Sequence, residues 1–463
     1  ISFDYSAHGE GDIGIDLVKV QSCGILNTYV PDNNFEAYLE THDASGNVVS
    51  VGDANSMGDG IANNDYVTTA NISGVTNLDI NSLNISDLTG IEDFISLTTL
   101  NCHINQLTNL DVTLNTALTS LNCQDNLLTS LNLTNNISLI NLYCNDNQLT
   151  NLDISQNTSL ENLNCHINQL SSLDLSQNTN LLTLSCFYNQ LTNLDLSQNI
   201  SLTSLNCQHN LLGSLDISNN TSLVNLYCNH NQLSTLDVAN NTNLALLYFN
   251  NNQIGSLNLT GLSSLTNLRF NDNLITNIDL SQNSNLIGEV WCQNNQLNSL
   301  DVRNGNNTNI TNLFTTGNSN LTCISVDNAS WATTNWTNID AHTIFLDDCA
   351  SFVALDADFS ADATTVCQGF AVNFTDASTG SAGITSWSWD FGDGASSTLQ
   401  NPTHTYTTAG TYGVILTVNG SDTETKAGYI TVIANPTVAL GNDVAICAGS
   451  TQTLDAGSTP TNY

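Results

Sequence analysis

One spacing dominates this sequence, because seven cysteines recur at intervals of 21 residues. They are Cys102, Cys123, Cys144, Cys165, Cys186, Cys207 and Cys228, and the column continues through Phe249 and Phe270 to Cys292 after one extra residue. Each period follows the approximate pattern L-x-x-L-x-C-x-x-N-Q-L-T-x-L-D-L-S-x-N-x-x. A fixed period of this length is typical of solenoids. It predicts ten stacked coils, each with two short β-strands that lie about 4.8 Å from those of the next coil.

This pattern resembles the leucine-rich-repeat family, in the short secreted bacterial form akin to the internalins, over about residues 72–326. An opening coil near Leu78 to Leu83 and a closing coil near Leu313 to Ile324 bring the expected number to about 10–12. The resemblance implies a mainly β fold, a parallel-β solenoid with an N-terminal cap at 27–71 and a C-terminal cap at 327–351. The sequence departs from the family by placing Cys where Leu is usual.

The interior of each coil can be inferred from strand geometry. Neighbouring residues of a strand face opposite ways, so Cys102 points inward and His103 outward, and no Cys/His chelate forms within a coil. We therefore expect a buried, mostly reduced ladder of thiols. A column of asparagines occupies the position where the chain leaves the strand, and buried amides there can satisfy turn backbone groups. Its members are Asn105, Asn126, Asn147, Asn168, Asn189, Asn210, Asn231, Asn252, Asn273 and Asn295.

Cys323 and Cys349 bracket the segment after the last coil, with Trp331 and Trp336 between them. A solenoid needs a lid over its exposed end. We expect a disulfide between these two cysteines across the C-terminal cap, which suits an oxidising exterior.

The variable residues around each cysteine should line the concave sheet. Exposed aromatic side chains among amides suit a sugar or an extended polypeptide, although tyrosine is also common in strands for purely structural reasons. His103, His166, His209 and His230 lie in the same columns. The candidate ligand-binding residues are Tyr143, Phe187, Tyr188, Tyr227, Tyr248, Arg269 and Trp291.

A column of acidic residues follows in the second predicted strand. Carboxylates about 5 Å apart repel by roughly 0.8 kcal/mol per pair in water, so something must offset the repulsion. Hydrogen bonds from Ser and Thr hydroxyls and nearby amides are one solution, and bridging Ca²⁺ or diffuse Na⁺ is the other. The members are Asp111, Asp153, Asp174, Asp195, Asp216, Asp237, Asp279 and Asp301, with Asn132 and Asn258 as substitutes.

The N-terminal cap resembles that of secreted leucine-rich-repeat proteins of the Bacteroidetes, with a short helix from about Phe35 to Glu40. A polar loop follows, and its density of oxygen atoms is typical of calcium loops. It departs from an EF-hand because Met57 occupies a ligand position and no Glu closes it, so a solvated turn is the alternative. The candidate Ca²⁺ ligands are Asp53, Asn55, Asp59, Asn63 and Asp65.

After the solenoid the period vanishes, and strands bounded by turns predict a sandwich. Residues 352–434 resemble a PKD domain, an Ig-like β-sandwich, through the sequence WSWDFGDG at 387–394. We expect Asp390 and Asp393 in it to brace the glycine-rich turn rather than to catalyse. Residues 435–463 resemble the start of an adhesin-type Ig-like repeat, a second and truncated sandwich. Residues 1–26 have no assignment beyond a strand at about 13–20.

The net charge and the absence of catalytic sequence motifs limit the functions that are possible. Four cationic residues stand against 42 carboxylates, for a formal net charge of −38. Nucleic acid and anionic membranes are therefore excluded as partners, and a salty, marine habitat is favoured because salt screens the repulsion. No stretch is long and apolar enough to span a membrane. No GxSxG, HExxH or P-loop motif is present, so we expect no enzyme in this stretch.

The sequence thus predicts an extracellular, cell-surface-attached adhesion segment that binds a protein or glycan through its concave face. The resemblances imply an excerpt of a much larger Bacteroidetes adhesin of the type IX secretion route. One alternative is a structural spacer that binds copies of itself in a surface appendage. Another is a non-catalytic module attached to a secreted enzyme.

Overall fold

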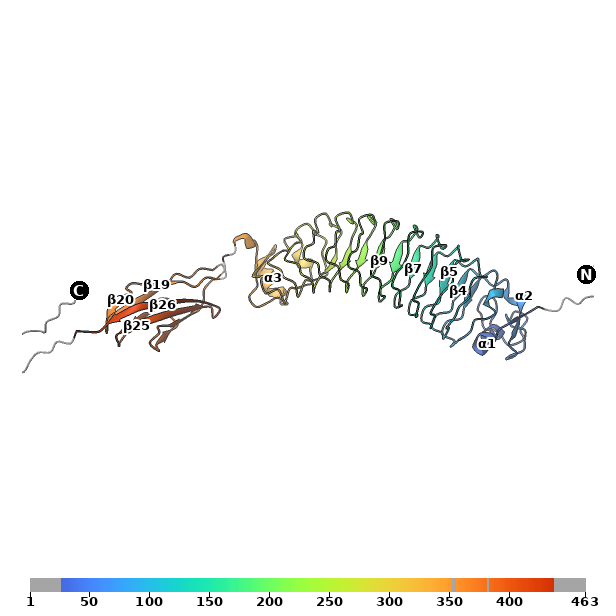
Figure 1. Cartoon of the computed structure of the whole chain (residues 1–463), viewed down its shortest axis with the longest axis horizontal. Coiled ribbons are helices and arrows are strands. Elements are labelled where there is room, and N and C mark those ends of the chain that lie inside the picture. Colours follow the sequence, from blue (N-terminus) through green and yellow to red (C-terminus); the bar gives the residue numbers. More distant parts are fainter. Residues whose placement is uncertain (1–25, 352, 354, 381–382, 437–463) are drawn as a thin grey trace, which may run out of the picture. The chain divides into compact units, whose positions relative to one another are not determined.

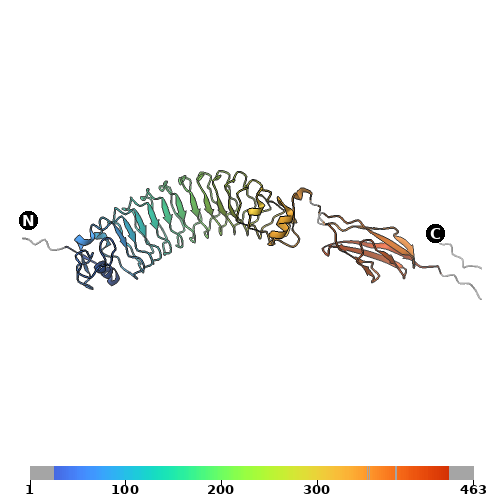
Figure 2. The same cartoon turned by 180° about the vertical axis from the view of Figure 1, so that it is seen from behind.

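The computed structural model describes residues 26–351, 353, 355–380 and 383–436 (Figures 1 and 2). The strand predicted at 13–20, and the truncated sandwich from residue 437 onward, lie outside this part of the chain. The chain divides into two compact units, Ile1–Asp347 and Asp348–Tyr463, which we describe separately.

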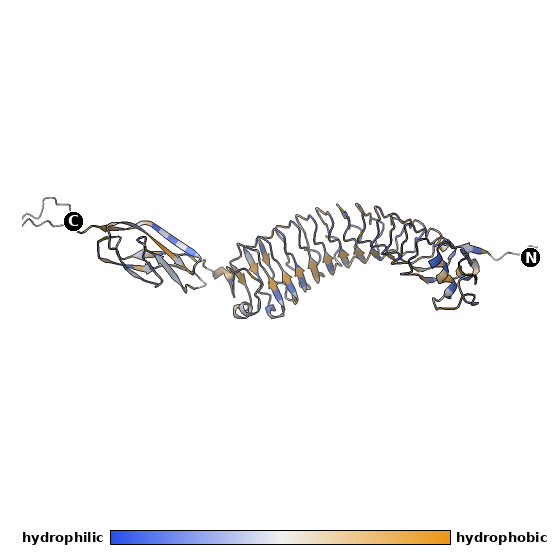
Figure 3. Ribbon diagram, turned by 90° about the horizontal axis from the view of Figure 1, so that it is seen from below, coloured by the Kyte–Doolittle hydropathy of each residue, from blue (hydrophilic) through white to orange (hydrophobic). Residues whose placement is uncertain are grey.

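The first unit is built on one parallel sheet of twelve strands in near-sequential order. The pairing is in register, so that Leu100 lies beside Leu121 and Leu121 beside Leu142. Figure 3 shows the strands side by side along the unit. This confirms the predicted solenoid, including its opening and closing coils. The strands are β3 (Asn77–Asp79), β4 (Thr99–Asn101), β5 (Ser120–Asn122), β6 (Asn141–Tyr143), β7 (Asn162–Asn164), β8 (Thr183–Ser185), β9 (Ser204–Asn206), β10 (Asn225–Tyr227), β11 (Leu246–Tyr248), β12 (Asn267–Arg269), β14 (Glu289–Trp291) and β16 (Asn312–Phe314).

The prediction of a second strand in every coil is wrong for most coils. A second parallel sheet forms only near the C-terminal end, from β13 (Asn277–Asp279), β15 (Ser299–Asp301), β17 (Cys323–Ser325) and β18 (Ile344–Leu346). In the earlier coils, one isolated parallel β-bridge joins Asp111 to Asn132. The stack of coils is curved (Figure 1), which separates the backbones on the side away from the main sheet.

The core confirms the thiol ladder. Cys102, Cys123, Cys144, Cys165, Cys186, Cys207, Cys228 and Cys292 are all buried and free. They share one continuous core with the leucines of the strands. Burial raises the pKa of Cys123, Cys186 and Cys228 to about 12. The thiols are therefore neutral packing groups at any physiological pH.

The asparagine column at the strand exit also acts as predicted. Asn126 donates from Nδ2 to the carbonyls of Cys102 and Cys123, each at 3.1 Å, and accepts from the Leu107 N–H at 3.0 Å. Each such amide therefore joins its own coil to the preceding one.

A second asparagine ladder was not predicted. Asn136 is fully buried and donates to the carbonyls of Val112 and Asn115 at 2.9 and 3.0 Å. The Oδ1 atoms of this ladder have no hydrogen-bond partner within the described residues. The ladder comprises Asn115, Asn136, Asn157, Asn178, Asn199, Asn220, Asn241 and Asn283.

The N-terminal cap contains β1 (Asn27–Tyr29), antiparallel to β2 (Tyr66–Thr68), and the helices α1 (Asn33–Thr41) and α2 (Thr69–Ile72). The short 3₁₀ helix η1 (Ile91–Asp93) lies in the first coil, after β3. Asp32 caps α1 by accepting from the N–H groups of Asn34 and Phe35, as short acidic side chains do at helix starts. Its other oxygen accepts from Ser86 N–H at 2.8 Å, which fastens the helix to the first coil.

The short 3₁₀ helix η2 (Asn307–Asn309) lies between β15 and β16, and the C-terminal cap contains α3 (Ala329–Asn335). The 3₁₀ helix η3 (Cys349–Ser351) falls at the start of the second unit. Trp336 is buried and donates from Nε1 to the carbonyl of Ile310 at 3.1 Å, with Trp331 packed edge-on against it. These side chains close the core, as expected of a lid. Cys323 and Cys349 are both disulfide-bonded, which is consistent with the predicted bridge.

The second unit is a β-sandwich. One sheet has the order β19-β21-β24 and the other the order β20-β26-β25-β22-β23. Trp389 and Tyr406 lie in the core between them. Asp390 accepts from Gly392 N–H, and Asp393 from Ala395 N–H and from His404, so both brace the turn. The strands are β19 (Phe359–Ala361), β20 (Thr365–Cys367), β21 (Ala371–Asp376), β22 (Trp387–Asp390), β23 (Ser396–Ser397), β24 (Thr403–Thr405), β25 (Gly410–Val418) and β26 (Asp422–Ile433).

Candidate ligand-binding face

The twelve-stranded sheet presents one regular row of side chains outward. In most of its strands the central residue is buried and the residues on either side are half-buried. We call the row formed by the third residue of each strand the face row. From β4 onward it reads Asn101, Asn122, Tyr143, Asn164, Ser185, Asn206, Tyr227, Tyr248, Arg269, Trp291 and Phe314.

The last five members form a continuous aromatic stripe, comprising Tyr227, Tyr248, Arg269, Trp291 and Phe314. The rings of Tyr227 and Tyr248 meet edge-on, with centroids 5.4 Å apart. The Arg269 guanidinium carbon lies 4.7 Å from the Tyr248 centroid and 4.3 Å from that of Trp291. Trp291 then contacts Phe314, with centroids 5.3 Å apart. Five successive strands thus carry one connected surface of rings around a single cation.

Glu289 fixes the centre of the aromatic stripe. Its Oε2 accepts a hydrogen bond from Trp291 Nε1 at 2.9 Å and lies 3.6 Å from Arg269. The carboxylate therefore orients the indole and also balances the charge of the guanidinium. The indole and the guanidinium are therefore both held by contacts within the protein.

A second aromatic group, which we call the imidazole stack, lies at the exits of earlier strands. Tyr188 stacks on His209 with centroids 4.1 Å apart, and His209 stacks on His230 at 4.0 Å. His166 stacks on Phe187, which meets Tyr188 edge-on. Burial, and then the neighbouring His230, lower the pKa of His209. This imidazole is therefore mainly neutral at pH 7.

The backbone holds the imidazole stack in place. Tyr188, His209 and His230 have φ values of 50°, 51° and 54°. This left-handed conformation is uncommon for residues other than glycine. It recurs at the equivalent position of successive coils, where the Asn column bonds the turn, so the ladder of amides determines where these rings project.

The structure brings most of the predicted site residues together. Tyr227, Tyr248, Arg269 and Trp291 form the aromatic stripe, and Phe187 and Tyr188 belong to the imidazole stack. Tyr143 stands apart, between Asn122 and Asn164 on the adjacent strands.

Phe314 and Glu289 were missed by the sequence interpretation. Phe314 occupies the same column as Trp291, but the repeat is longer there and the column is harder to follow. Glu289 lies two positions before Trp291 on the same strand, so its side chain is on the same face.

The hydrogen bonds of the first predicted solution are present along the Asp column. Asp111 accepts from the hydroxyl and the N–H of Thr113 at 2.6 and 2.9 Å, and these bonds lower the pKa of its carboxyl. Hydrogen bonds from the residue two positions later likewise lower the pKa values of Asp153, Asp174, Asp195 and Asp216.

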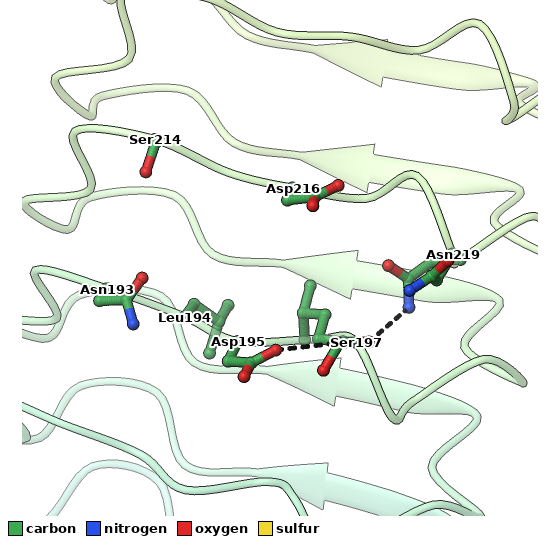
Figure 4. A pocket seen from close by; sticks show the side chains of 9 residues that line it. Asn193, Leu194, Asp195, Ser197, Ser214, Asp216 and Asn219 are labelled. Atoms are coloured by element: carbon green, nitrogen blue, oxygen red, sulfur yellow. Dashed lines mark hydrogen bonds between the residues drawn. The ribbon is translucent and has the colours of Figure 1, made fainter.

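A polar pocket lies between Asp195 and Asp216 (Figure 4). Asn193, Ser197, Ser214 and Asn219 also line it, and no aromatic side chain does. It is therefore separate from both aromatic groups of the sheet face.

In the predicted calcium loop, two carboxylates accept hydrogen bonds from N–H groups of the loop itself. Asp53 accepts from Asn55 N–H at 2.8 Å, and Asp59 from Ile61 N–H at 2.9 Å. Asn63 and Asp65 have φ values of 58° and 65°. In the parts of the chain that the structure describes, no three His, Cys, Asp or Glu side chains are arranged to hold a metal ion. Calcium at this loop stays a prediction.

Known structures share the fold of the solenoid. The functional domain of InlJ from Listeria monocytogenes, which includes a cysteine ladder, is 24% identical, with a TM-score of 0.58 over 89% of this chain and 99% of that one. An internalin of the same organism, InlF, is 22% identical, with a TM-score of 0.53 over 71% of this chain and 99% of that one. The solenoid has an internalin-like leucine-rich-repeat fold.

The second unit is also matched, because residues 356–432 fit the family model of the PKD domain. No curated protein sequence matches the chain. None of these similarities indicates an enzyme family. Within the described residues, no helix is both long and apolar enough to cross a membrane.

Proposed function

We propose that this chain is a non-catalytic binding segment of an extracellular, surface-attached adhesin, and that its aromatic stripe contacts a protein or glycan ligand. The observation that carries this proposal is the unbroken contact of Tyr227, Tyr248, Arg269, Trp291 and Phe314 across five strands. Aromatic residues and arginine are the types most enriched at binding hot spots. Their preorganisation by Glu289 reduces the entropy lost on binding.

Strand preference alone does not explain this arrangement. Tyrosine and tryptophan suit any strand, yet the face row before the stripe holds Asn or Ser at every position from Asn101 to Asn206 except Tyr143. The rings are instead gathered at one end, where each supports the next. Such a local patch, flanked by amides, is typical of a recognition surface.

Charge favours a foreign ligand over copies of the same chain. The formal net charge of −38 repels a second copy, most strongly at low salt. The disulfide-bonded Cys323 and Cys349 suit a protein exposed to an oxidising exterior. A Bacteroidetes-type adhesin exported by the type IX route would meet these conditions.

The test is binding of the purified chain to a glycan array and to a displayed library of surface-protein fragments, with and without calcium. Trp291→Ala should weaken any hit at least about tenfold, or about 1.4 kcal/mol. Tyr143→Ala is the matched control, because it removes an aromatic ring from the same row outside the stripe.

Equal losses in both variants would place the ligand elsewhere. An absence of hits, together with a mass that rises with protein concentration in solution, would instead identify a self-associating spacer.

A further inference from the structure

The aromatic stripe and the imidazole stack share one coil of the solenoid. The coil that contains β10 carries Tyr227 of the stripe and, three residues later, His230 of the stack. Ring contacts then lead away from this coil in both directions, to His209 at 4.0 Å and to Tyr248 at 5.4 Å between centroids. Every coil from β7 to β16 therefore presents a ring or the guanidinium of Arg269, and we call this whole surface the aromatic face.

Carboxylates lie on both sides of the imidazole stack. The residues with left-handed φ at the strand exits form one column, which we call the exit column. Two carboxylates come before the rings of this column and one comes after them. In chain order it reads Ile104, Asp125, Asp146, Ile167, Tyr188, His209, His230, Asn251, Asp272 and Asn294.

The aromatic face carries little positive charge. Arg269 is the sole lysine or arginine of the face row and the exit column. Its guanidinium lies 3.6 Å from the carboxylate of Glu289, so its charge is already balanced. Asp146, on the exit column, lies 3.4 Å from His166, which is charged only when protonated. The face as a whole therefore favours a cationic ligand over an anionic one.

Buried oxygens between the face row and the exit column lack donors. Within the described residues, Asn145 Oδ1, Asn229 Oδ1 and Gln293 Oε1 accept no hydrogen bond. Asn145 and Asn229 are 4% and 7% exposed, and Asn229 lies in the coil that the stripe and the stack share. Buried oxygens of this kind are normally paired. Because the groups left over are all acceptors, a ligand rich in N–H donors fits the face, and the charged ends of lysine and arginine are donors only.

The tilt of the rings favours a polypeptide over a sugar chain. The planes of Tyr227 and Tyr248 differ by 87°, and those of Trp291 and Phe314 by 57°. A sugar chain stacks on ring faces that share a plane, and the stripe does not present such a platform. Cations bind over individual ring faces, and apolar side chains fill the space between tilted rings.

Building on the proposed function, we propose that the ligand of the aromatic face is a basic polypeptide segment that lies along the solenoid. Its lysine or arginine side chains bind Asp146 and Asp272, and its apolar side chains pack on the rings between them. These two carboxylates are six coils apart. At about 4.8 Å per coil they are about 29 Å apart, which an extended chain spans with about nine residues. The formal net charge of −38 attracts such a segment from a distance.

The imidazole stack makes this binding sensitive to acid. Burial lowers the pKa of His209 and His166, so both are neutral above the ordinary histidine value of about 6.5. The charged groups that act on these imidazoles are His230 at His209, and Asp146 and Asp125 at His166. Protonation adds positive charge to the middle of the face, and a basic segment is then repelled. A neutral ligand would not respond in this way.

The experiment is an array of synthetic peptides about twelve residues long, graded from acidic to basic at constant aromatic content and printed beside neutral and acidic oligosaccharides. The full chain should bind the basic peptides at about 0.15 M salt. The tightest peptide is then titrated by fluorescence anisotropy. The double variant Asp146→Asn with Asp272→Asn should weaken its binding about tenfold, and a fall from about pH 7.5 to about pH 5.5 should weaken it by a similar factor.

Asp174→Asn with Asp216→Asn is the matched control, because it removes the same charge from the Asp column, where asparagine already occurs at 132 and 258. It should change the affinity less than about twofold. Equal losses in the two double variants would overturn the proposal in favour of diffuse attraction.

The array also separates this proposal from the one on which it rests. Binding to oligosaccharides that Trp291→Ala weakens, and that the change of Asp146 and Asp272 does not, would overturn the basic ligand and keep the aromatic stripe as a binding surface. A chain that binds no member of the array at either pH would overturn both.

Discussion

The guanidinium of Arg269 lies between the rings of Tyr248 and Trp291, which come from the coils on either side of it. One residue therefore contacts three successive coils through the sheet face. Removing the cation while keeping apolar volume, as in Arg269→Met, should destabilise the first unit by about 1 kcal/mol, since partly exposed cation–π contacts contribute on this scale. Chemical denaturation followed by tryptophan fluorescence measures the change.

Arg303→Met is the control for that substitution. Arg303 binds the carboxylate of Asp301 on an exposed surface, where ion pairs contribute little. If both variants lose the same free energy of unfolding, the stacking of Arg269 between the two rings contributes no more to stability than an exposed ion pair.

The buried thiols should be chemically inert in the folded chain. The thiolate is the reactive form, and burial raises the pKa of Cys123, Cys186 and Cys228 to about 12. Mass spectrometry after brief alkylation at pH 8 should show Cys367, which is exposed, labelled well before the ladder. The ladder should react only after denaturant is added, and rapid labelling of Cys144 under native conditions would contradict the structure.

Each asparagine of the column should contribute more to the stability of the fold than an exposed asparagine does. Asn147 donates to the carbonyls of Cys123 and Cys144 and accepts from Leu128 N–H. Asn147→Ala leaves these buried groups without partners, at a cost of about 2–4 kcal/mol. Urea unfolding should show this loss, whereas Asn180→Ala, at an exposed position with one bond to Thr158, should cost less than about 1 kcal/mol.

The Asp column should make the solenoid sensitive to acid. Hydrogen bonds from Thr113 lower the pKa of Asp111 in the folded state. A lowered folded pKa contributes stability that is present above the unfolded value of about 3.9 and is lost as the pH falls through the folded value. Thr113→Val should raise the pKa of Asp111, as measured by carboxyl NMR, and move the onset of acid unfolding to higher pH.

Thr119→Val serves as the control for the acid experiment, because the Thr119 hydroxyl donates to the carbonyl of Thr98 and touches no carboxylate. An unchanged pKa of Asp111 in Thr113→Val would mean that the backbone N–H alone sets it.

The repeat made the solenoid predictable, since a strict 21-residue period leaves few other ways to bury one column of Leu and one of Cys. The second strand was predicted wrongly for most coils, from alternation alone. Alternating apolar residues indicate which side chains are buried, and Leu110 and Val112 are indeed buried. Hydrogen bonding between strands also depends on the distance between coils, and the curvature of the stack changes this distance. The sequence of one coil contains no direct information on that distance.

The candidate site was predicted in part for a similar reason. Column positions identified Tyr227, Tyr248, Arg269 and Trp291, because strand geometry fixes which face each residue occupies. Phe314 was missed because the repeat lengthens between Trp291 and Phe314, so that its column is harder to follow.

The amide of Asn147 recognises only main-chain atoms of its own coil and of the one before it, and the same holds for Asn126 and Asn168. The amide column therefore does not tie a coil to one place in the stack. Duplication or loss of one 21-residue unit among these coils would leave the amide bonds of each remaining junction complete, so these bonds permit the solenoid to change its length in whole coils.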